Sequence, residues 1–273
     1  TLGSMCGLYS AILENYKKRC DMLAISKIPD VYSYLPHLSD VKHLDDVDKS
    51  RDYDLVINVD VASIDRICDA KILFDKAKFN VNIDHHKTNN AYGKLNFINP
   101  GASSTGEVLF ECFSRMGWKV NLNTAICIYT AILTDTGSFR FDNTKPSTFE
   151  TASKLVEIGV NPSDIYKKVY ESDSKTLVMF QAHCISKAKF LNDDKIAYTL
   201  VYKKDMEKFG AGDDCMEGLT EKLRAIVTTR IAFVAKEMKS GGTKISMRSK
   251  FADVAEICGI FGGGGHKYAA GCT

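Results

Sequence analysis

Length, composition and charge bound the kinds of protein that this chain can be. Its 273 residues are enough for two domains of ordinary size, each with an apolar core of its own. The 36 Lys and Arg residues nearly balance the 34 Asp and Glu residues, so the net charge of +2 excludes the strong overall positive field with which proteins bind long duplexes.

The first part of the chain alternates helix and strand patterns. In chain order, we predict a helix that begins after the capping residue Ser4, a strand at 22–25, a strand at 55–59, a helix at 64–78, a strand at 81–83, helices at 107–116 and 122–134, an extended segment at 138–141, and helices that begin near Pro146 and Pro162. Residues 55–83 form a βαβ crossover. This order predicts an α/β fold, with a mostly parallel sheet that has helices on both faces.

The pattern changes after a long helix predicted at 175–190. A polar turn follows at 192–194, and then a strand at 196–202, a helix at 216–227, strands at 231–236 and 244–248, a helix and a glycine run. We therefore predict a first domain at 1–174, a linker helix at 175–192 and a smaller α/β domain at 193–273.

The spacing of the cysteines and the length of the apolar runs indicate the cellular compartment. Nine cysteines are scattered singly along the chain, which argues against a zinc knuckle and against a disulfide framework. No apolar run approaches the roughly 20 residues that a membrane-spanning helix needs. We therefore expect reduced thiols and a cytoplasmic protein with no membrane partner. The oligomeric state is open, and a homodimer is compatible with the sequence.

Acidic residues and histidines follow the predicted strands of the first domain. Asp60 ends one strand of the βαβ unit, and Asp84 ends the other, directly before His85 and His86. Because the carboxyl ends of neighbouring parallel strands meet at one edge of a sheet, these side chains should lie together. Asp135 closes a helix at a position suited to the same edge. Carboxylate and imidazole donors without thiolates favour Mn²⁺ or Mg²⁺ over structural zinc, although each motif alone is also typical of a turn or a helix cap.

These motifs resemble those of the DHH phosphoesterase family, which is named after the triplet Asp84-His85-His86. Val59-Asp60 is similar to the second family motif and Asp135-Thr136-Gly137 to the fourth. The segment 261–266 is similar to the glycine-rich signature of the DHH-associated C-terminal domain, so the resemblance spans nearly the whole chain. Spacing and size are most similar to the bacterial branch of nano-RNases and pAp phosphatases.

The resemblance implies a centre of two metal ions, usually Mn²⁺, with Mg²⁺ as the alternative. Asp60 would bridge both ions, and His85 and Asp135 would complete the second metal site. His86 would face the substrate phosphate, and Asp84 would orient the histidines. Such a centre activates water and neutralises phosphoryl oxygens.

The first family motif is the one departure from the pattern. The family has a His-x-Asp-x-Asp run directly before small residues, and this chain begins inside that element at Thr1-Leu2-Gly3-Ser4. The three ligands of this motif are therefore absent from the sequence. We expect that a natural N-terminal segment precedes Thr1 and that the chain as printed hydrolyses substrates poorly. The alternative is a protein that binds nucleic acid without catalysis.

The second domain carries groups suited to a phosphate. A run of four glycines lets backbone N–H groups approach an anion closely, and a helix that began after the run would add its dipole; a hinge is the plain alternative. The resemblance assigns substrate binding, in a cleft between the domains, to Arg248, Ser249, Gly263, Gly264, Gly265 and His266. In the first domain, we expect substrate contacts from Ser104 or Thr105, for which helix capping is the alternative.

The motifs together predict a metal-dependent hydrolase of phosphate esters. We expect it to act on very short oligoribonucleotides, on linear dinucleotides such as pApA or pGpG, or on pAp, because a closed cleft that binds a terminal phosphate favours short substrates. A cyclic-dinucleotide phosphodiesterase is the alternative among enzymes.

Overall fold

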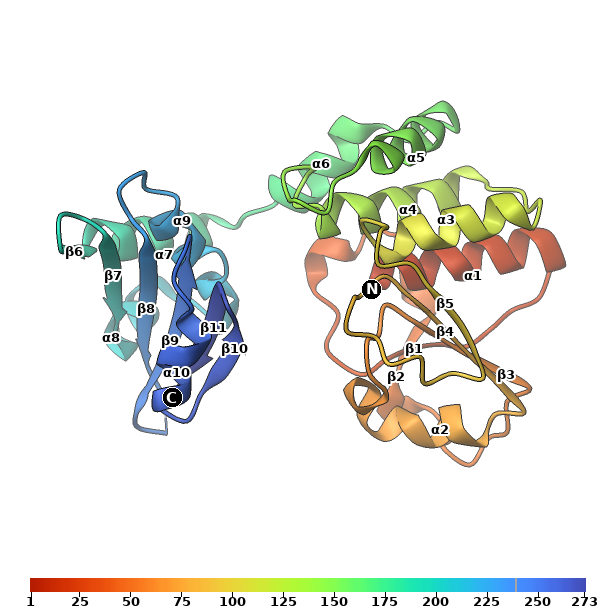
Figure 1. Cartoon of the computed structure of the whole chain (residues 1–273), viewed down its shortest axis with the longest axis horizontal. Coiled ribbons are helices and arrows are strands. Elements are labelled where there is room, and N and C mark those ends of the chain that lie inside the picture. The colour runs from red at the N-terminus through yellow and green to blue at the C-terminus, as the bar shows by residue number, and fades with distance from the viewer. Residues whose placement is uncertain (239) are drawn as a thin grey trace. The chain divides into compact units, whose positions relative to one another are not determined.

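The computed structural model describes residues 1–238 and 240–273. The chain divides into two compact units, Thr1–Ser172 and Asp173–Thr273 (Figure 1). Within the described residues, no helix is both long enough and apolar enough to cross a membrane.

The first unit contains two small parallel sheets and a layer of helices. Its elements are α1 (Leu2–Tyr16), β1 (Met22–Ala24), β2 (Val41–His43), β3 (Leu55–Val59), α2 (Lys71–Lys76), β4 (Phe79–Asp84), β5 (Leu95–Ile98), α3 (Thr105–Arg115), α4 (Leu122–Asp135), α5 (Pro146–Glu157) and α6 (Pro162–Tyr170), with short 3₁₀ helices between some of them. Strand β1 pairs with β2, and β4 lies between β3 and β5. Helices α1, α3 and α4 lie on one side of the larger sheet and α2 on the other (Figure 1). The predicted parallel sheet with helices on both faces is therefore confirmed.

The core of the first unit forms around α4 and β4. Five of the six residues of β4 are buried, which is typical of a central parallel strand covered on both faces. Helix α1 packs closely on α4 because Gly3 lies at the contact. A Cβ atom at Gly3 would come within 2.6 Å of the Cys127 carbonyl oxygen, so a larger residue there would push the two helices apart.

The second unit is built on one mixed sheet of six strands. Its elements are α7 (Lys175–Ser186), β6 (Lys189–Leu191), β7 (Ile196–Val201), α8 (Lys203–Phe209), α9 (Leu219–Arg224), β8 (Ile231–Glu237), β9 (Thr243–Ser249), α10 (Val254–Ile260), β10 (Gly264–His266) and β11 (Ala269–Cys272). The strand order is β10-β11-β9-β8-β7-β6, and β7 and β8 run parallel while the other neighbours are antiparallel. Residues of α7 and α9 pack on one face, and residues of α10 pack on the other face against β9 and β11.

Several elements differ from those predicted. The first helix begins at Leu2 rather than after Ser4. The predicted helix at 64–78 is a 3₁₀ segment, Ile64–Ala70, followed by α2, because Cys68 has a left-handed φ of 47° that breaks the helix. The predicted extended segment at 138–141 is a turn, in which two consecutive residues have φ values of 62°. Helix α7 ends at Ser186, and the polar turn at 192–194 joins β6 to β7.

Candidate metal centre

The candidate site lies where β3 and β4 end. Asp60 directly follows β3, and its N–H group donates to the Ile83 carbonyl at 2.9 Å, which extends the strand pairing to the site. Its φ of 64° lies in the left-handed region, which aspartate tolerates better than most residues. The structure brings together donor atoms of Asp60, Asp84, His85 and His86, all within 4.8 Å of one another.

His85 faces two carboxylates. Its Nε2 atom lies 3.6 Å from Oδ1 of Asp60 and 3.3 Å from Oδ2 of Asp135, the last residue of α4. On the other side of the ring, Nδ1 lies 3.4 Å from the Ala102 carbonyl oxygen, which can only accept a hydrogen bond. With the proton on Nδ1, the Nε2 lone pair and two carboxylates converge. Each of these three groups offers a lone pair, so together they can act as the ligands of a divalent cation.

The two carboxylates influence each other's protonation. Burial and the negative charge of Asp60 both raise the pKa of Asp135. Burial also raises the pKa of Asp60, whereas the hydrogen bond that its Oδ1 atom accepts from the Thr105 hydroxyl at 2.9 Å lowers it.

Asp84 acts as an anchor rather than as a partner of the other carboxylates. It is fully buried, and its Oδ1 atom accepts hydrogen bonds from His86 Nδ1 at 2.7 Å and from the His85 N–H group at 2.8 Å. Its Oδ2 atom accepts from Asn89 Nδ2 at 2.6 Å. These contacts fix both the backbone after β4 and the ring of His86, as the orienting role expected for Asp84 requires.

Asn89 is a residue that the sequence reasoning missed. Besides Asp84, its Nδ2 group donates to the Val61 carbonyl at 3.1 Å, and its Oδ1 atom accepts from Asn82 Nδ2 at 3.0 Å. Asn89 thus ties the loop after β3 to the loop after β4. Its position shortly after the histidine pair was the only signal in the sequence, and a single asparagine in a loop is most often a turn residue.

The two hydroxyl residues at the start of α3 have different partners. Ser104 is buried and caps the helix, since its Oγ atom accepts from the Glu107 N–H group at 3.1 Å. Thr105 is also buried, and its hydroxyl donates to Oδ1 of Asp60 at 2.9 Å. Capping is therefore the observed role of Ser104, and Thr105 positions a candidate metal ligand. Substrate contact by either residue stays a prediction.

The proposed phosphate-binding residues of the second unit lie on neighbouring strands. His266 of β10 is opposite Ala269 of β11, which is opposite Arg248 of β9, so the three residues form one row across the sheet. The Arg248 Nε group donates to Glu221 of α9 at 2.6 Å, so this guanidinium already has an acidic partner. Buried Ser249 donates its hydroxyl to the Ala252 carbonyl.

The glycine run has a structural role in its first part and is exposed in its second. A Cβ atom at Gly263 would lie within 2.2 Å of the Gly271 carbonyl oxygen, so only glycine fits beside β11. Gly264, Gly265 and His266 form the exposed edge strand β10. A strand and not a helix therefore follows the start of the run, and no helix dipole adds to anion binding here.

Fold and site together define the class of protein. Residues 1–132 match the model of the DHH family, N-terminal domain. The chain belongs to the DHH family of phosphoesterases, as its motifs predicted.

Individual relatives show which members of the family this chain is similar to. The chain is 30% identical over 275 residues to the bifunctional oligoribonuclease and PAP phosphatase NrnA of Bacillus subtilis (strain 168), with 99% of this chain and 84% of that protein covered. It is 28% identical to the NrnA of Thermus thermophilus, with 100% and 79% covered. Among solved structures, an exopolyphosphatase-related protein from Bacteroides fragilis has a TM-score of 0.91 at 26% identity and covers 100% of this chain and 82% of its own.

Proposed function

We propose that this chain hydrolyses phosphate esters of very short oligoribonucleotides, of linear dinucleotides such as pApA and pGpG, or of pAp. The observation that supports this best is the convergence of Asp60, His85 and Asp135 at the ends of two parallel strands. Relatives that align over nearly the whole chain are named for oligoribonuclease and PAP phosphatase activities. The predicted domain at 1–174 would carry the reaction, and the one at 193–273, joined by the linker helix, would bind substrate.

We propose Mn²⁺ as the ion, with Mg²⁺ as the second candidate, because the donors are oxygen and nitrogen atoms without a thiolate. Asp60, His85 and Asp135 would hold one ion, and Asp60 would share its carboxylate with a second. Bound ions of this kind neutralise phosphoryl oxygens and lower the pKa of a bound water. These three residues are the part of the proposed site that substitutions can test.

His86 is the residue that we expect to meet the substrate phosphate. Its side chain is 38% exposed, whereas its partner Asp84 is fully buried. Because Nδ1 is held by Asp84, the ring cannot turn away, and Nε2 is left to donate to a phosphate oxygen. This pairing provides orientation in advance of substrate binding, which is an efficient source of rate acceleration.

Arg248 and His266 would bind a phosphate remote from the scissile bond. They lie in one row on the same face of the sheet, and the small side chain of Ala269 between them leaves room for an anion. Glu221 would have to share the Arg248 guanidinium with that anion. A guanidinium can do so because it has five N–H donors.

The test is a comparison of substrates with and without metal. The purified chain is treated with chelator, and hydrolysis of pApA, pGpG, pAp, a cyclic dinucleotide and a small synthetic phosphodiester is measured before and after Mn²⁺ or Mg²⁺ is restored. We expect turnover of the linear substrates only with metal. Undiminished hydrolysis after chelation would contradict the metal site, and faster cleavage of the cyclic than of the linear dinucleotide would favour the alternative enzyme class.

A further inference from the structure

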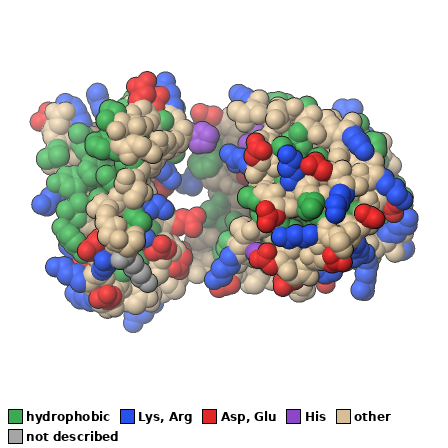
Figure 2. Space-filling view, turned by 90° about the horizontal axis from the view of Figure 1, so that it is seen from below, with side chains coloured by type: hydrophobic (Ala, Val, Ile, Leu, Met, Phe, Trp, Pro, Cys, Tyr) green, Lys and Arg blue, Asp and Glu red, His purple; other side chains and the backbone are tan. Residues whose placement is uncertain are grey.

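One face of the second unit's sheet is only partly covered by helices. Side chains of α10 pack on this face against β9 and β11. On β7, the buried residues Ala197, Thr199 and Val201 point toward α7 and α9, and the alternating residues Tyr198 and Leu200 lie half-exposed on the opposite face. Strands β6 to β8 therefore present half-exposed side chains on the face that α10 only partly covers. Figure 2 shows hydrophobic side chains gathered on the second unit, with Lys and Arg and also Asp and Glu around them.

Two aromatic rings on this face are stacked. Tyr198 lies opposite Phe233 in the β7–β8 pairing, and their ring centroids are 4.9 Å apart with an angle of 7° between the planes. Both residues are only half-buried. Near them, Tyr202 is 41% exposed, with the ammonium groups of Lys187 and Lys204 within 5.6 Å of its ring centroid. Flat aromatic surfaces of this kind are platforms on which unpaired bases stack.

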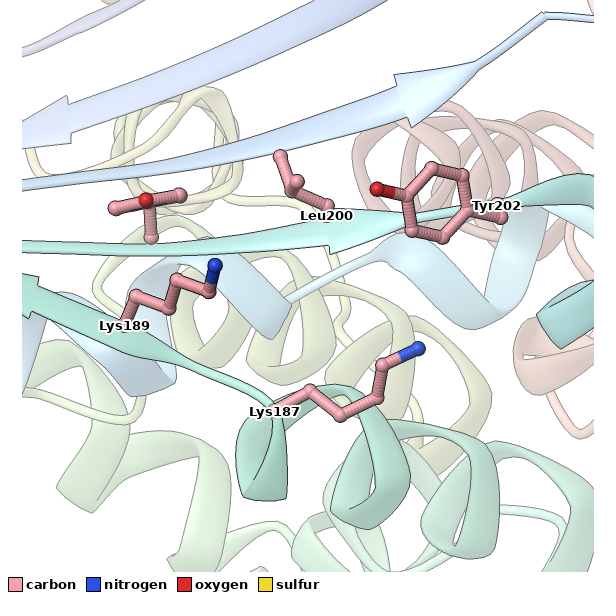
Figure 3. Close-up of a pocket in the computed structure, with 5 residues that line it drawn as sticks. Lys187, Lys189, Leu200 and Tyr202 are labelled. Carbon is pink, nitrogen blue, oxygen red and sulfur yellow. The ribbon is translucent and has the colours of Figure 1, made fainter.

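The charges beside the rings are positive. The depression on this face is lined by Lys187, Lys189, Tyr198, Leu200 and Tyr202 (Figure 3), and none of these five residues carries a carboxylate. Lys187 donates to buried Asp205 at 2.9 Å. Lys189, which lies opposite Tyr198 in the β6–β7 pairing, has no ion-pair or hydrogen-bond partner for its ammonium group among residues 1–238 and 240–273. Phosphates complement this charge, whereas a second copy of the same face would bring lysines against lysines.

We propose that this surface, called here the stacking face (Lys187, Lys189, Tyr198, Leu200, Tyr202 and Phe233), binds the bases and phosphates of single-stranded RNA. It is separate from the residues assigned above to a remote phosphate, because Arg248 lies opposite Ala232, which is buried on the face packed by α7 and α9. This inference does not depend on the proposed hydrolysis, since binding can be measured without turnover.

The experiment measures binding by the full chain in the presence of chelator. The probe is a fluorescent oligoadenylate of about eight nucleotides, within the site size of roughly 4–16 nucleotides known for single-strand-binding folds. Tyr198→Leu and Phe233→Leu remove a ring but keep apolar volume, and each should weaken binding on the order of 10-fold. Phe190→Leu is the matched control, because Phe190 lies opposite buried Ala197 and so belongs to the other face.

Salt dependence tests the phosphate contact. Lys189→Gln should reduce the slope of log affinity against log salt by about 0.7, the value for one phosphate contact on a single strand. Lys244→Gln, which changes a lysine opposite Lys236 on the other face, should leave the slope unchanged. An oligomer of the same charge without bases should bind wild type and the leucine variants equally.

Three outcomes would overturn the proposal. Wild-type affinity in both leucine variants would show that the rings of Tyr198 and Phe233 do not stack on bases. A loss of affinity in the Phe190→Leu control as large as in the leucine variants of the stacking face would show a general effect on the fold. Conversion of a dimer to a monomer by Tyr198→Leu, measured by sedimentation, would identify a second copy of the chain as the occupant instead. A loss of affinity confined to the stacking-face variants, with unchanged unfolding temperatures, is the expected result.

Discussion

Asp60 combines a functional side chain with an unusual backbone. Its carboxylate contacts Thr105 and faces His85, and its φ is 64°. Asparagine tolerates left-handed backbone nearly as well as aspartate, so Asp60→Asn should keep the fold while it removes the charge that both ions would share. We expect this change to be the most damaging to turnover of any single ligand substitution, and to lower kcat by at least about 100-fold, as expected when several kcal/mol of transition-state stabilisation is lost.

The measurement is hydrolysis of pApA at saturating Mn²⁺, with Asp135→Asn as the comparison because Asp135 would contact one ion only. Near-normal kcat for Asp60→Asn would contradict its shared role. An unchanged unfolding temperature in both variants would show that the loss is chemical.

Asn89 should act on the reaction through Asp84. Asn89→Ala leaves Oδ2 of a fully buried carboxylate without its donor, a loss that typically amounts to roughly 1–3 kcal/mol. We expect kcat to fall about 10-fold with little change in KM, because His86 loses its fixed orientation while the candidate metal ligands remain. The control is Asn99→Ala, which removes a comparable hydrogen bond to a loop N–H group at 3.0 Å. Equal kcat values for the two variants would contradict the positioning role.

At the scale of single residues, the sequence predicted the side chains but not their partners. The strand-end rule brought Asp60, Asp84, His85 and His86 to one edge of the sheet, and the structure places them there. The contacts of Thr105 and Asn89 depend on the paths of loops that have no periodic pattern. Only the three-dimensional course of the chain reveals such contacts.

At the scale of elements, the row across β9, β11 and β10 gives a prediction about substrate length. Arg248→Ala should reduce catalytic efficiency on pApA by about 10- to 150-fold, since a charge-assisted hydrogen bond contributes roughly 1.5–3 kcal/mol. A small synthetic phosphodiester has no remote phosphate and should be little affected. Lys244→Ala, on the same strand and face, is the matched control. Equal losses on both substrates would place Arg248 in the reaction centre or the fold.

Helix α8 gives a prediction about pH. Asp205 is buried, which raises its pKa, but hydrogen bonds from Lys187, His183 and the Tyr202 N–H group lower it to about 2. Because the pKa in the folded state is below the ordinary 3.8, the carboxylate stabilises the fold above about pH 4, and this stabilisation is lost as the pH falls through about 2. Asp205→Asn should therefore lower the free energy of unfolding by about 1–2 kcal/mol at neutral pH, and by less as the pH approaches 2.

Circular dichroism during denaturant unfolding at several pH values measures this difference. Asp193→Asn is the control, because that exposed carboxylate pairs with Lys195 and exposed pairs contribute little. A difference between Asp205→Asn and wild type that stayed constant down to about pH 2 would contradict the assigned cause.

Helix and strand patterns predicted many of the elements, and local backbone conformation accounts for two of the failures. Strands β7, β8 and β9 lie within one residue of the predicted bounds, and buried and half-buried residues alternate along β7 and the first part of β8. The break at Cys68 and the turn at Ser138 depend on left-handed backbone at residues other than glycine. Propensity gives no warning of such positions, since surrounding contacts impose them.

For the whole molecule, the two units should respond differently to metal. The single tryptophan, Trp118, stacks on Phe113 in the first unit, with ring centroids 5.5 Å apart. Its fluorescence therefore reports on the unit that contains Asp60, His85 and Asp135. Mn²⁺ at about 100 times its Kd should stabilise that unit by about 2.7 kcal/mol and raise the midpoint of the fluorescence transition. Asp60→Asn should abolish the shift, and a shift of equal size in that variant would place the ion elsewhere.

The left-handed conformation of Asp60 also has a genetic consequence. A single nucleotide change converts an aspartate codon into one for asparagine or glycine, and both residues accept this backbone. Mutations at this position can therefore yield proteins that fold and accumulate normally but have lost a candidate metal ligand. In a mutational scan, the loss of cells that carry variants at position 60 would indicate selection for metal-dependent activity. The loss of cells that carry variants at Gly3 would indicate selection for a folded chain.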